Sequence, residues 1–326
     1  MTRLRSLAIA FSMLVACAMA APTARAADDY PNRPVRILVP FPAGGPTDVN
    51  MRILGQKLSE IWGEGVVIEN RPGGNTGIAA TAVARAEPDG YTLLAAMDST
   101  LVMNPAMAVP MNYDPFKDFA PITLTARNTS LLTVHAESPF KTIKDLIAHA
   151  KKNGKPLTYG AGIAITQLAG QRFGQEAGIE VTLVPYRGSS EVVQGLLTQS
   201  VDFIVDGIAP SLPLISTGKF RPLAKLNSRH LTALPDVPLL AKAPGLPLEE
   251  MASWIALVAP DGTPPAVVDK IHRDVVKAYE DETVIKRLDQ AGITADTMAP
   301  DELNSFYRKE AEHWTQTYKK SGLKFK

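Results

Sequence analysis

Strand-like and helix-like segments alternate along this chain in two series, and this alternation constrains the fold more than any other feature of the sequence. The first series has short apolar strands at 35–39, 66–69 and 91–97, with helical patterns at 47–62 and 77–86 between them. A β-α-β-α-β order predicts parallel strands joined by right-handed crossovers. We therefore expect a doubly wound α/β unit in the first part of the chain.

The middle of the chain repeats the alternation. Strands are predicted at 157–159, 181–184 and 201–205, with helices at 166–176 and 191–199 between them. A length of 326 residues suits two domains of this kind. The predicted fold class is therefore α/β, with two doubly wound lobes and a ligand cleft between them.

Helices are also predicted outside the two series. The segment KTIKDLIAHAKKNG places Thr142 as an N-cap and Asp145 three residues later, and it ends at Asn153-Gly154. After the second series, the pattern indicates one strand and three helices, at 254–259, 265–279, 282–291 and 300–320.

Two extended apolar segments, 119–126 and 220–226, lie at the seams between the series, and we interpret them as crossings between the lobes. The predicted division gives one discontinuous lobe, 27–122 plus 226–326, and a second lobe, 123–225. Two crossings would form a hinge. In open α/β sheets, ligands bind outside the carboxyl ends of the strands, so these ends are expected to surround the cleft.

Residues 1–26 resemble a secretory signal peptide. Arg3 and Arg5 give a basic start, an apolar core covers 7–17, and small residues at 24–26 suit cleavage. An alternative is a lipoprotein, because LVAC resembles a lipobox that ends at Cys17. Either interpretation predicts export to the periplasm.

Composition and spacing disfavour several classes of function. The net charge of +1 and the 6% aromatic content give nucleic acid neither a basic surface nor stacking platforms. Cys17 is the single cysteine, so the exported chain has no disulfide and no thiolate metal site. The five histidines are scattered, and no HExxH or GxSxG motif occurs. Asp202 and Asp206 lie four residues apart on a strand, too far apart for an acid/base pair. We therefore expect no cofactor, no metal and no enzymatic activity, with a hydrolase as the less favoured reading.

The loop FPAGGPTD follows the first strand and opens the first helix. Bare glycines and a proline at the first helical position leave backbone N–H groups exposed, which predicts an anion site. The loop lacks both the P-loop ending and the G-x-G-x-x-G spacing, so a nucleotide is disfavoured. The alternative is a tight turn that Asp48 caps. The predicted donors are Ala43, Gly44, Gly45, Thr47 and Asp48.

Two further glycine clusters follow strands. One is NRPGGNTG, which contains Asn75 and Thr76, and the other is YGAGIAITQ in the second lobe. Three bare loops from both lobes would surround the cleft and present backbone donors from both sides.

Several longer motifs resemble one family throughout the chain after the signal. They are YPNRPVRILVPFPAGGPTD, VVIENRPGG, AEPDGYTLL, YDPFKDFAPIT, VPYRGSSEVVQGLLTQSVDFIVD, LPDVPLLAKAPGLP and WIALVAPDGTP, together with Asn104-Pro105. The sequence is similar to the Bug-type periplasmic substrate-binding proteins of tripartite tricarboxylate transporters.

That resemblance implies a two-lobed, type II periplasmic binding protein, expected to be monomeric. It implies a small organic carboxylate as ligand, mono- or dicarboxylic or aromatic, and a membrane permease as partner. A periplasmic sensor that signals to a membrane kinase remains the alternative, because both would use the same cleft. In the family, the first glycine loop and a second-lobe loop hold the carboxylate, which implies Ala161, Gly162, Ile163 and Ala164 in the second loop.

The sequence departs from the family pattern near the expected ligand. The loop from Tyr159 to Gly170 is shorter, lacks a Gly-Thr pair and has Gln167 where the family has histidine. Asp98, followed by Ser99, stands where the family has a small hydroxyl residue. Asp98 is either a helix cap or a pocket carboxylate that favours ligands with a donor.

Asp206 matches a family aspartate at a strand end. It would accept from the ligand or from backbone. Its alternative role is a turn residue before Gly207.

Overall fold

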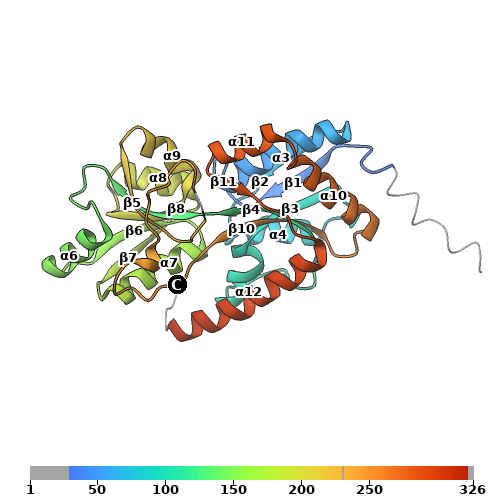
Figure 1. Cartoon of the computed structure of the whole chain (residues 1–326). Coiled ribbons are helices and arrows are strands. Elements are labelled where there is room, and N and C mark those ends of the chain that lie inside the picture. The colour runs from blue at the N-terminus through green and yellow to red at the C-terminus, as the bar shows by residue number, and fades with distance from the viewer. Residues whose placement is uncertain (1–28, 230, 322–326) are drawn as a thin grey trace, which may run out of the picture.

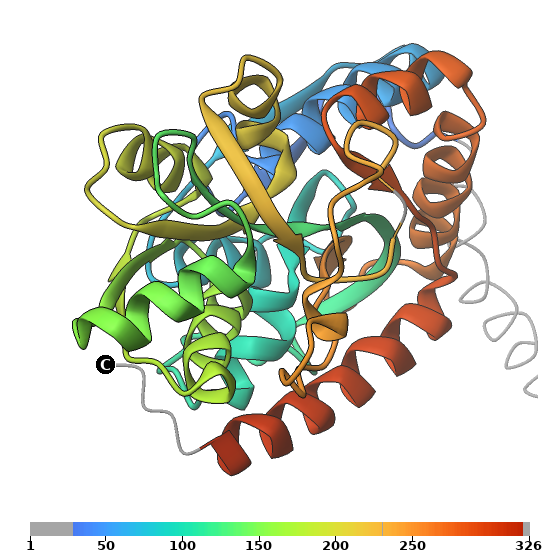
Figure 2. The same cartoon turned by 60° about the vertical axis from the view of Figure 1, so that its left-hand side comes forward.

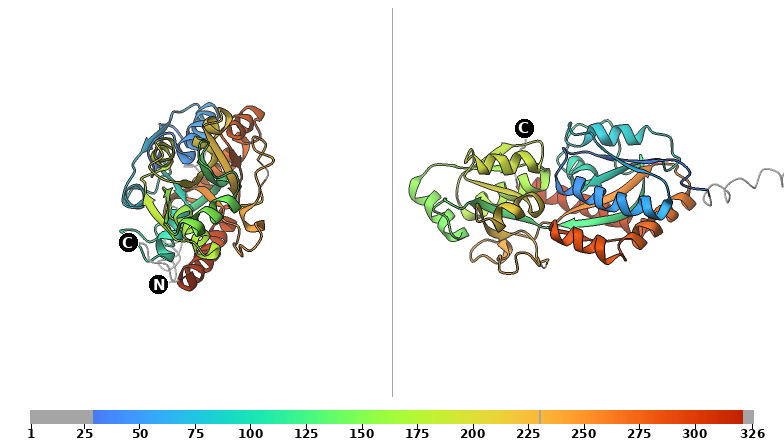
Figure 3. Two further views of the ribbon diagram at one scale, coloured as in Figure 1. Left: turned by 90° about the vertical axis from the view of Figure 1, so that its left-hand side faces the viewer. Right: turned by 90° about the horizontal axis from the view of Figure 1, so that it is seen from above.

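The computed structural model describes residues 29–229 and 231–321, so the predicted signal peptide and Cys17 lie outside the described residues. Two sheets form two lobes that lie side by side (Figures 1 and 3). The larger sheet has the strand order β11-β4-β10-β3-β1-β2, and the smaller has the order β7-β6-β8-β5-β9. We call them, with their helices, the large and small lobes. The predicted two-lobed α/β fold is confirmed.

The first series of predicted elements forms the parallel half of the large sheet. β1 pairs in parallel with both β2 and β3, as the β-α-β order predicts. Apolar strands buried on both faces explain why these segments are almost continuously hydrophobic. The elements are β1 (Val35–Val39), α3 (Pro46–Trp62), β2 (Val66–Asn70), α4 (Gly77–Ala84) and β3 (Thr92–Met97).

The other half of the large sheet is antiparallel. β10 (Ser253–Pro260) lies between β3 and β4 (Phe119–Asn128), and β11 (Ile293–Ala295) pairs with the far edge of β4. The segment predicted as the first crossing is thus mostly β4, which pairs on both sides within this sheet. The lobe boundary expected between residues 122 and 123 falls inside β4. The chain leaves the large sheet only between 128 and 130.

The small lobe contains the second series. β6 is parallel to β7 and β8, whereas β5 is antiparallel to β8 and β9. The second predicted crossing is β9, an edge strand from which the chain returns to the large lobe. The pattern did not predict β5 or α9. The elements are β5 (Ser130–His135), α6 (Ile143–Asn153), β6 (Leu157–Ala161), α7 (Ala164–Ala177), β7 (Val181–Pro185), α8 (Ser189–Leu197), β8 (Phe203–Gly207), α9 (Ile208–Ser216) and β9 (Phe220–Lys225).

Helices cover both faces of the large sheet. One core cluster joins strand residues such as Ile37 to α3 and α10, and another joins Trp254 to the long helix α12. Figure 2 shows α12 along the lower side of the large lobe. Among the described residues, no helix is apolar over a length that would cross a bilayer. The remaining elements are η1 (Ser99–Met103), α5 (Asn104–Ala106), η2 (Leu240–Lys242), α10 (Pro265–Ala278), α11 (Glu282–Gln290) and α12 (Pro300–Ser321).

The two chain crossings between the lobes are tied together by Asn227. Its Oδ1 accepts a hydrogen bond from Thr129 Oγ1 at 2.9 Å. Its Nδ2 donates to the carbonyls of Asn128 and Met251, at 3.4 Å each. Asn227 and Thr129 are buried. This network joins the segment between β4 and β5 to the segment that returns to β10.

Candidate ligand-binding cleft

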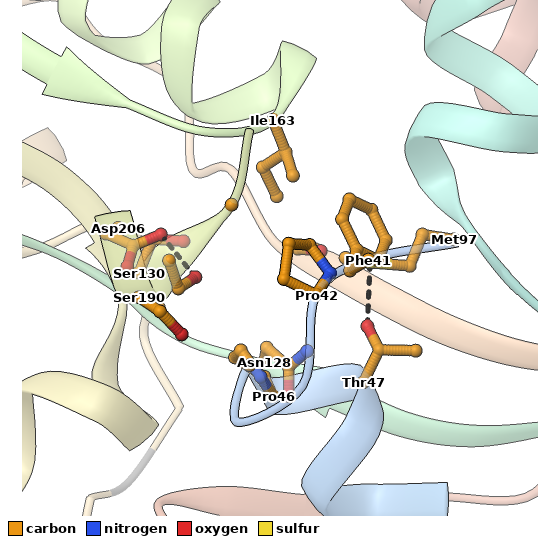
Figure 4. Close-up of a pocket in the computed structure, with 15 residues that line it drawn as sticks. Phe41, Pro42, Pro46, Thr47, Met97, Asn128, Ser130, Ile163, Ser190 and Asp206 are labelled. Atoms are coloured by element: carbon orange, nitrogen blue, oxygen red, sulfur yellow. Dashed lines mark hydrogen bonds between the residues drawn. The ribbon is translucent and has the colours of Figure 1, made fainter. Parts of the chain in front are cut away.

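One pocket lies between the lobes, where the carboxyl ends of parallel strands from both sheets meet (Figure 4). The space between its walls is about 490 Å³ when the part open to solvent is counted. The wall combines apolar side chains with a few buried polar ones. The lining residues are Phe41, Pro42, Gly45, Pro46, Thr47, Met97, Asn128, Ser130, Ile163, Gly188, Ser189, Ser190, Asp206, Gly207 and Ser253.

Four helices begin at this pocket. The residues that precede α3, α7, α8 and α9 are Gly45, Ile163, Gly188 and Gly207, and each of them lines the pocket. None of these four N-termini donates a hydrogen bond to a capping side chain, although the Ile208 N–H of α9 donates to the Thr129 carbonyl at 3.2 Å. The first-turn N–H groups of a helix have no intrahelical partner, and they lie at the positive end of the helix dipole. Both lobes therefore direct partial positive charge at one space, which suits an anion.

The first glycine loop differs in one respect from the expected nest of free donors. Gly44 has φ +85° and its N–H already donates to Asp48 Oδ2 at 2.9 Å. Asp48 also contacts Arg52 and Asn70. Burial alone would raise the pKa of Asp48, but hydrogen bonds from Arg52, Gly44 and Asn70 lower it. Asp48 therefore fixes the loop, as the turn interpretation predicts, and Gly44 is not a free donor.

Thr47 lines the pocket from the first turn of α3. Its hydroxyl donates to Met97 Sδ at 3.0 Å, as Figure 4 shows. The first helical hydrogen bond of this end runs from Val49 N–H to the Gly45 carbonyl at 3.0 Å. The N–H groups that precede Val49, including that of Thr47, therefore have no acceptor within the helix, as at any helix N-terminus.

The lobes touch each other around the pocket. Ser190 Oγ donates to the Ala43 carbonyl at 3.3 Å, across the two lobes. A Cβ added to Gly188 would lie 3.2 Å from Pro42 Cδ, and one added to Gly207 would lie 3.1 Å from Pro46 Cγ. Bare backbone in the small lobe thus lets the large-lobe loop approach closely.

Asp206 is the acidic residue of the lining. It is 2% exposed, and its Oδ1 accepts a hydrogen bond from Ser189 Oγ at 2.9 Å. Its Oδ2 has no partner among the described residues. Burial raises the pKa of Asp206 to about 7, although the hydrogen bond from Ser189 opposes that rise.

Asp98 is a helix cap in this structure. It is 1% exposed, and its Oδ1 accepts from the N–H of Ser99 at 2.5 Å and from the Ser99 hydroxyl at 3.2 Å, at the start of η1. Burial raises the pKa of Asp98 to about 7. Neither Asp98 nor Ser99 lines the pocket.

The structure brings only part of the predicted site together. Gly45, Thr47, Ile163 and Asp206 line the pocket. Asn75 and Thr76 lie in another loop, where the Asn75 carbonyl and Thr76 Oγ1 accept from Asn104 Nδ2. Asn75 and Thr76 therefore serve a structural turn here, not the pocket wall. The predicted residues that do not line it are Ala43, Gly44, Asp48, Asn75, Thr76, Asp98, Ser99, Ala161, Gly162 and Ala164.

Sequence reasoning missed two groups of lining residues. Gly188, Ser189 and Ser190 follow β7 as the glycine loops follow other strands, so the same rule could have found them. Asn128 and Ser253 face each other in the antiparallel pair β4 and β10, which no local pattern reveals.

The chemistry of the lining favours binding over catalysis. The lining within residues 29–229 and 231–321 contains no lysine, arginine or histidine, so the helix N-termini supply its positive potential. Among residues 29–229 and 231–321, no cluster of three His, Cys, Asp or Glu side chains could hold a metal.

Comparison with known proteins agrees with the arrangement. Residues 50–323 match the model of the tripartite tricarboxylate transporter family receptor. Protein BugT of Bordetella pertussis is 30% identical over 329 aligned residues, which cover 100% of this chain and 99% of BugT.

Two solved structures from Rhodopseudomonas palustris are also similar. Rpa4515 with adipate has a TM-score of 0.86 and 32% identity, covering 90% of this chain and 99% of that one. MatC with bound malate has a TM-score of 0.81 and 29% identity, covering 88% of this chain and 99% of that one. The members of this family are solute-binding proteins, not enzymes. This chain therefore belongs to the tripartite tricarboxylate transporter receptor family, in its Bug-type branch.

Proposed function

We propose that this protein binds a small organic carboxylate between its lobes in the periplasm and delivers it to a tripartite tricarboxylate-type permease. The observation that carries the proposal is the convergence of four uncapped helix N-termini, from both lobes, on one pocket. The adipate and malate in the two similar structures are small carboxylates, which supports this ligand class.

The mechanism of capture follows from the placement of the donors. The α3 N-terminus belongs to the large lobe, and those of α7, α8 and α9 belong to the small lobe. A carboxylate between them would bridge the lobes, so ligand binding would favour the closed arrangement. The two crossings at Thr129 and Asn227 would serve as the hinge.

A thermal-shift screen of mono-, di- and aromatic carboxylates tests the proposal directly. A ligand present at a hundredfold excess over its dissociation constant should stabilise the protein by about 2.7 kcal/mol. Small-angle scattering should show a smaller radius of gyration with the best acid than without it. If no acid in the panel stabilised the protein, carboxylate capture would be rejected. A pull-down of the permease with the loaded protein tests the delivery step.

A further inference from the structure

Unpartnered polar atoms gather at the pocket. Among the described residues, the buried side-chain atoms without a hydrogen-bond partner include Asp206 Oδ2 and Asn128 Oδ1. Both residues line the pocket. Buried polar atoms without partners are costly, and they are rare in folded proteins. A bound molecule that supplies the missing partners would remove that cost.

The geometry of Asp206 fixes which atom faces a ligand. Ser189 Oγ holds Oδ1, so the carboxyl group has one orientation and Oδ2 remains for another partner. Figure 4 shows Asp206 on the small-lobe side of the pocket, across from Pro42 and Thr47 of the large lobe. An ionised Oδ2 and the Asn128 Oδ1 are both acceptors, so both require a donor from the ligand.

The acidic side chains in the first turns of α3 and α8, two helices that begin at the pocket, are already paired. On α3, Asp48 pairs with Arg52, and on α8, Glu191 pairs with Arg187.

Behind the pocket wall, Asp98 bonds to Ser99 and also interacts with Ser253 of the lining. β5, β8, β10, the first turn of α7 and the first turn of α9 contribute no charged lining residue besides Asp206 itself. Among the described lining residues, none therefore presents a cation to the Asp206 carboxylate.

A plain carboxylate ligand meets a conflict in this pocket. The helix N-termini attract it, but an ionised Asp206 in the same buried space repels it. An amino group on the ligand would give Asp206 a cationic donor, and a hydroxyl group would give it a neutral one. A charge-assisted hydrogen bond is the stronger of the two.

We propose that Asp206 selects organic acids that carry a hydrogen-bond donor on the carbon beside the carboxylate, with an ammonium group preferred to a hydroxyl. This selection rests on the proposed function and names the ligand subclass within it. The pKa of Asp206 is raised to about 7, which agrees with a carboxylate that has no cationic partner until such a ligand binds. The ammonium group would lower that pKa and hold the carboxyl group ionised.

The test compares matched acids that differ only at that carbon. Each carbon skeleton is measured by calorimetry as the unsubstituted, hydroxy and amino acid. The sets are propionate, lactate and alanine; succinate, malate and aspartate; and adipate, 2-hydroxyadipate and 2-aminoadipate. Within the skeletons that bind, we expect the amino acid to bind at least about tenfold more tightly than the unsubstituted acid, with the hydroxy acid between them.

The affinity of the protein should depend on pH differently for unsubstituted acids and for amino acids. Above about pH 7, Asp206 is ionised, so the affinity for unsubstituted acids should fall from about pH 6 to about pH 8. Over the same range, the affinity for the amino acids should hold or rise. Equal affinity for substituted and unsubstituted acids in every skeleton, with no difference in pH dependence, would overturn the selection. If no acid of any set bound, the proposed function itself would fail, and the two results are thus distinguishable.

Two isosteric variants locate the effect. Asp206→Asn keeps the shape but removes the charge, so it should abolish the preference for amino acids and the pH dependence. Asp98→Asn is the matched control, because Asp98 is equally buried and its pKa is also about 7, yet it does not line the pocket. It should leave the ranking of the acids unchanged. An unchanged ranking in folded Asp206→Asn, or the same loss in Asp98→Asn, would refute the role of Asp206. If Asp206→Asn did not fold, the pH dependence of folded Asp98→Asn would decide, because that variant keeps Asp206 and removes the other carboxyl group whose pKa is about 7.

Discussion

The helices that begin at the cleft differ from two helices that begin on the outer surface. α6 starts with a capping box, in which Thr142 Oγ1 accepts from the Asp145 N–H at 3.2 Å and Asp145 Oδ2 accepts from the Thr142 N–H at 2.9 Å. α11 starts with Asp281, which accepts from the Thr283 N–H at 2.8 Å. The cleft helices α3, α7, α8 and α9 have no such side-chain acceptor.

This difference shows how a pocket can be made receptive with few polar side chains. A good N-cap contributes about 1 kcal/mol to a helix. At α6 and α11, the chain supplies the cap and keeps that stability, although α4 and α10, which begin away from the pocket, also lack a side-chain cap. At the cleft, the donors stay without a side-chain acceptor, and a ligand carboxylate can take the place of the missing caps. Each helix N-terminus can thus either be stabilised by a side-chain cap or be left open to bind an anion. Variants that add or remove a cap test this comparison.

The largest effect is expected when a charged cap is placed at the cleft. Ile163 has φ −133° and ψ 156° at the start of α7, a typical N-cap conformation. In Ile163→Asp, the new carboxylate would accept hydrogen bonds from the first-turn N–H groups of α7 and would repel the negatively charged ligand. We expect affinity for the best acid to fall by about 100-fold, measured by calorimetry.

Ile163→Asn is the matched control for that variant. It supplies a cap without a charge and loses the same apolar contacts, so its loss should be about tenfold. Equal losses in the two variants would show that packing of Ile163 matters and that competition for the anion site does not.

A slightly smaller effect is expected from the first glycine loop. Gly44 has φ +85°, so Gly44→Val would strain the backbone by about 1–3 kcal/mol and move the loop, with at least about tenfold weaker binding. The sequence pattern alone predicts the same severity for Gly45. However, Gly45 has φ −79°, and an added Cβ would lie 3.8 Å from the Pro42 carbonyl oxygen.

Gly45→Ala is therefore the control, with an expected change in affinity below about threefold. Calorimetry on both folded variants measures this difference. A severe loss in Gly45→Ala would mean that the ligand contacts the backbone at that residue.

The parallel parts of the fold could be predicted because their strands and helices alternate within short distances. The antiparallel parts could not. β4 and β5 are separated by Thr129 alone, so no loop marks the boundary between them, and only pairing with different sheets divides the two strands. α9 contains Pro213 inside the helix, a residue that a local pattern takes as a helix breaker.

The candidate site divides in a similar way. Glycine loops after parallel strands pointed to Gly45 and Ile163, because the carboxyl ends of such strands meet at one edge. Asp98 follows β3 and Asp206 lies near the end of β8, yet only Asp206 lines the pocket. Which of these side chains borders the pocket depends on how the two lobes pack, which is not encoded locally.

The response to pH should have opposite signs at the two kinds of carboxyl group. Lys57 and the Thr283 N–H lower the pKa of Asp281 to about 2. The ionised Asp281 therefore contributes to folding stability above about pH 4, and this contribution is lost as the pH falls toward 2. Burial raises the pKa of Asp206 to about 7. The ligand-free protein should therefore be more stable below about pH 4, where Asp206 is protonated in both the folded and unfolded states, and less stable as the pH rises to 7.

Thermal melts of the free protein and of Asp206→Asn from about pH 4 to about pH 7 measure this difference. The native protein should lose more stability over that range than the variant. Parallel curves would contradict a buried, unpartnered Asp206.

A modest effect is expected when a surface cap is removed. Thr142→Ala should lower the free energy of unfolding by about 1 kcal/mol, because Asp145 N–H loses its acceptor. Denaturant unfolding measures the loss. Affinity for the best acid should stay the same, since α6 begins outside the pocket, and a weaker affinity would show that the two kinds of N-terminus are coupled.

The smallest effect is expected at Thr47, although it lines the pocket. Its hydroxyl is engaged with Met97 Sδ, a weak acceptor, and the main chain of α3 supplies the charge complementarity. Thr47→Ala should therefore change affinity by less than about threefold, and Thr47→Val, which keeps the volume, by less still. Calorimetry on the two variants separates the hydroxyl from the space it fills. A tenfold loss in both would mean that the hydroxyl leaves Met97 to bind the ligand, and the cleft would then depend on a side-chain donor after all.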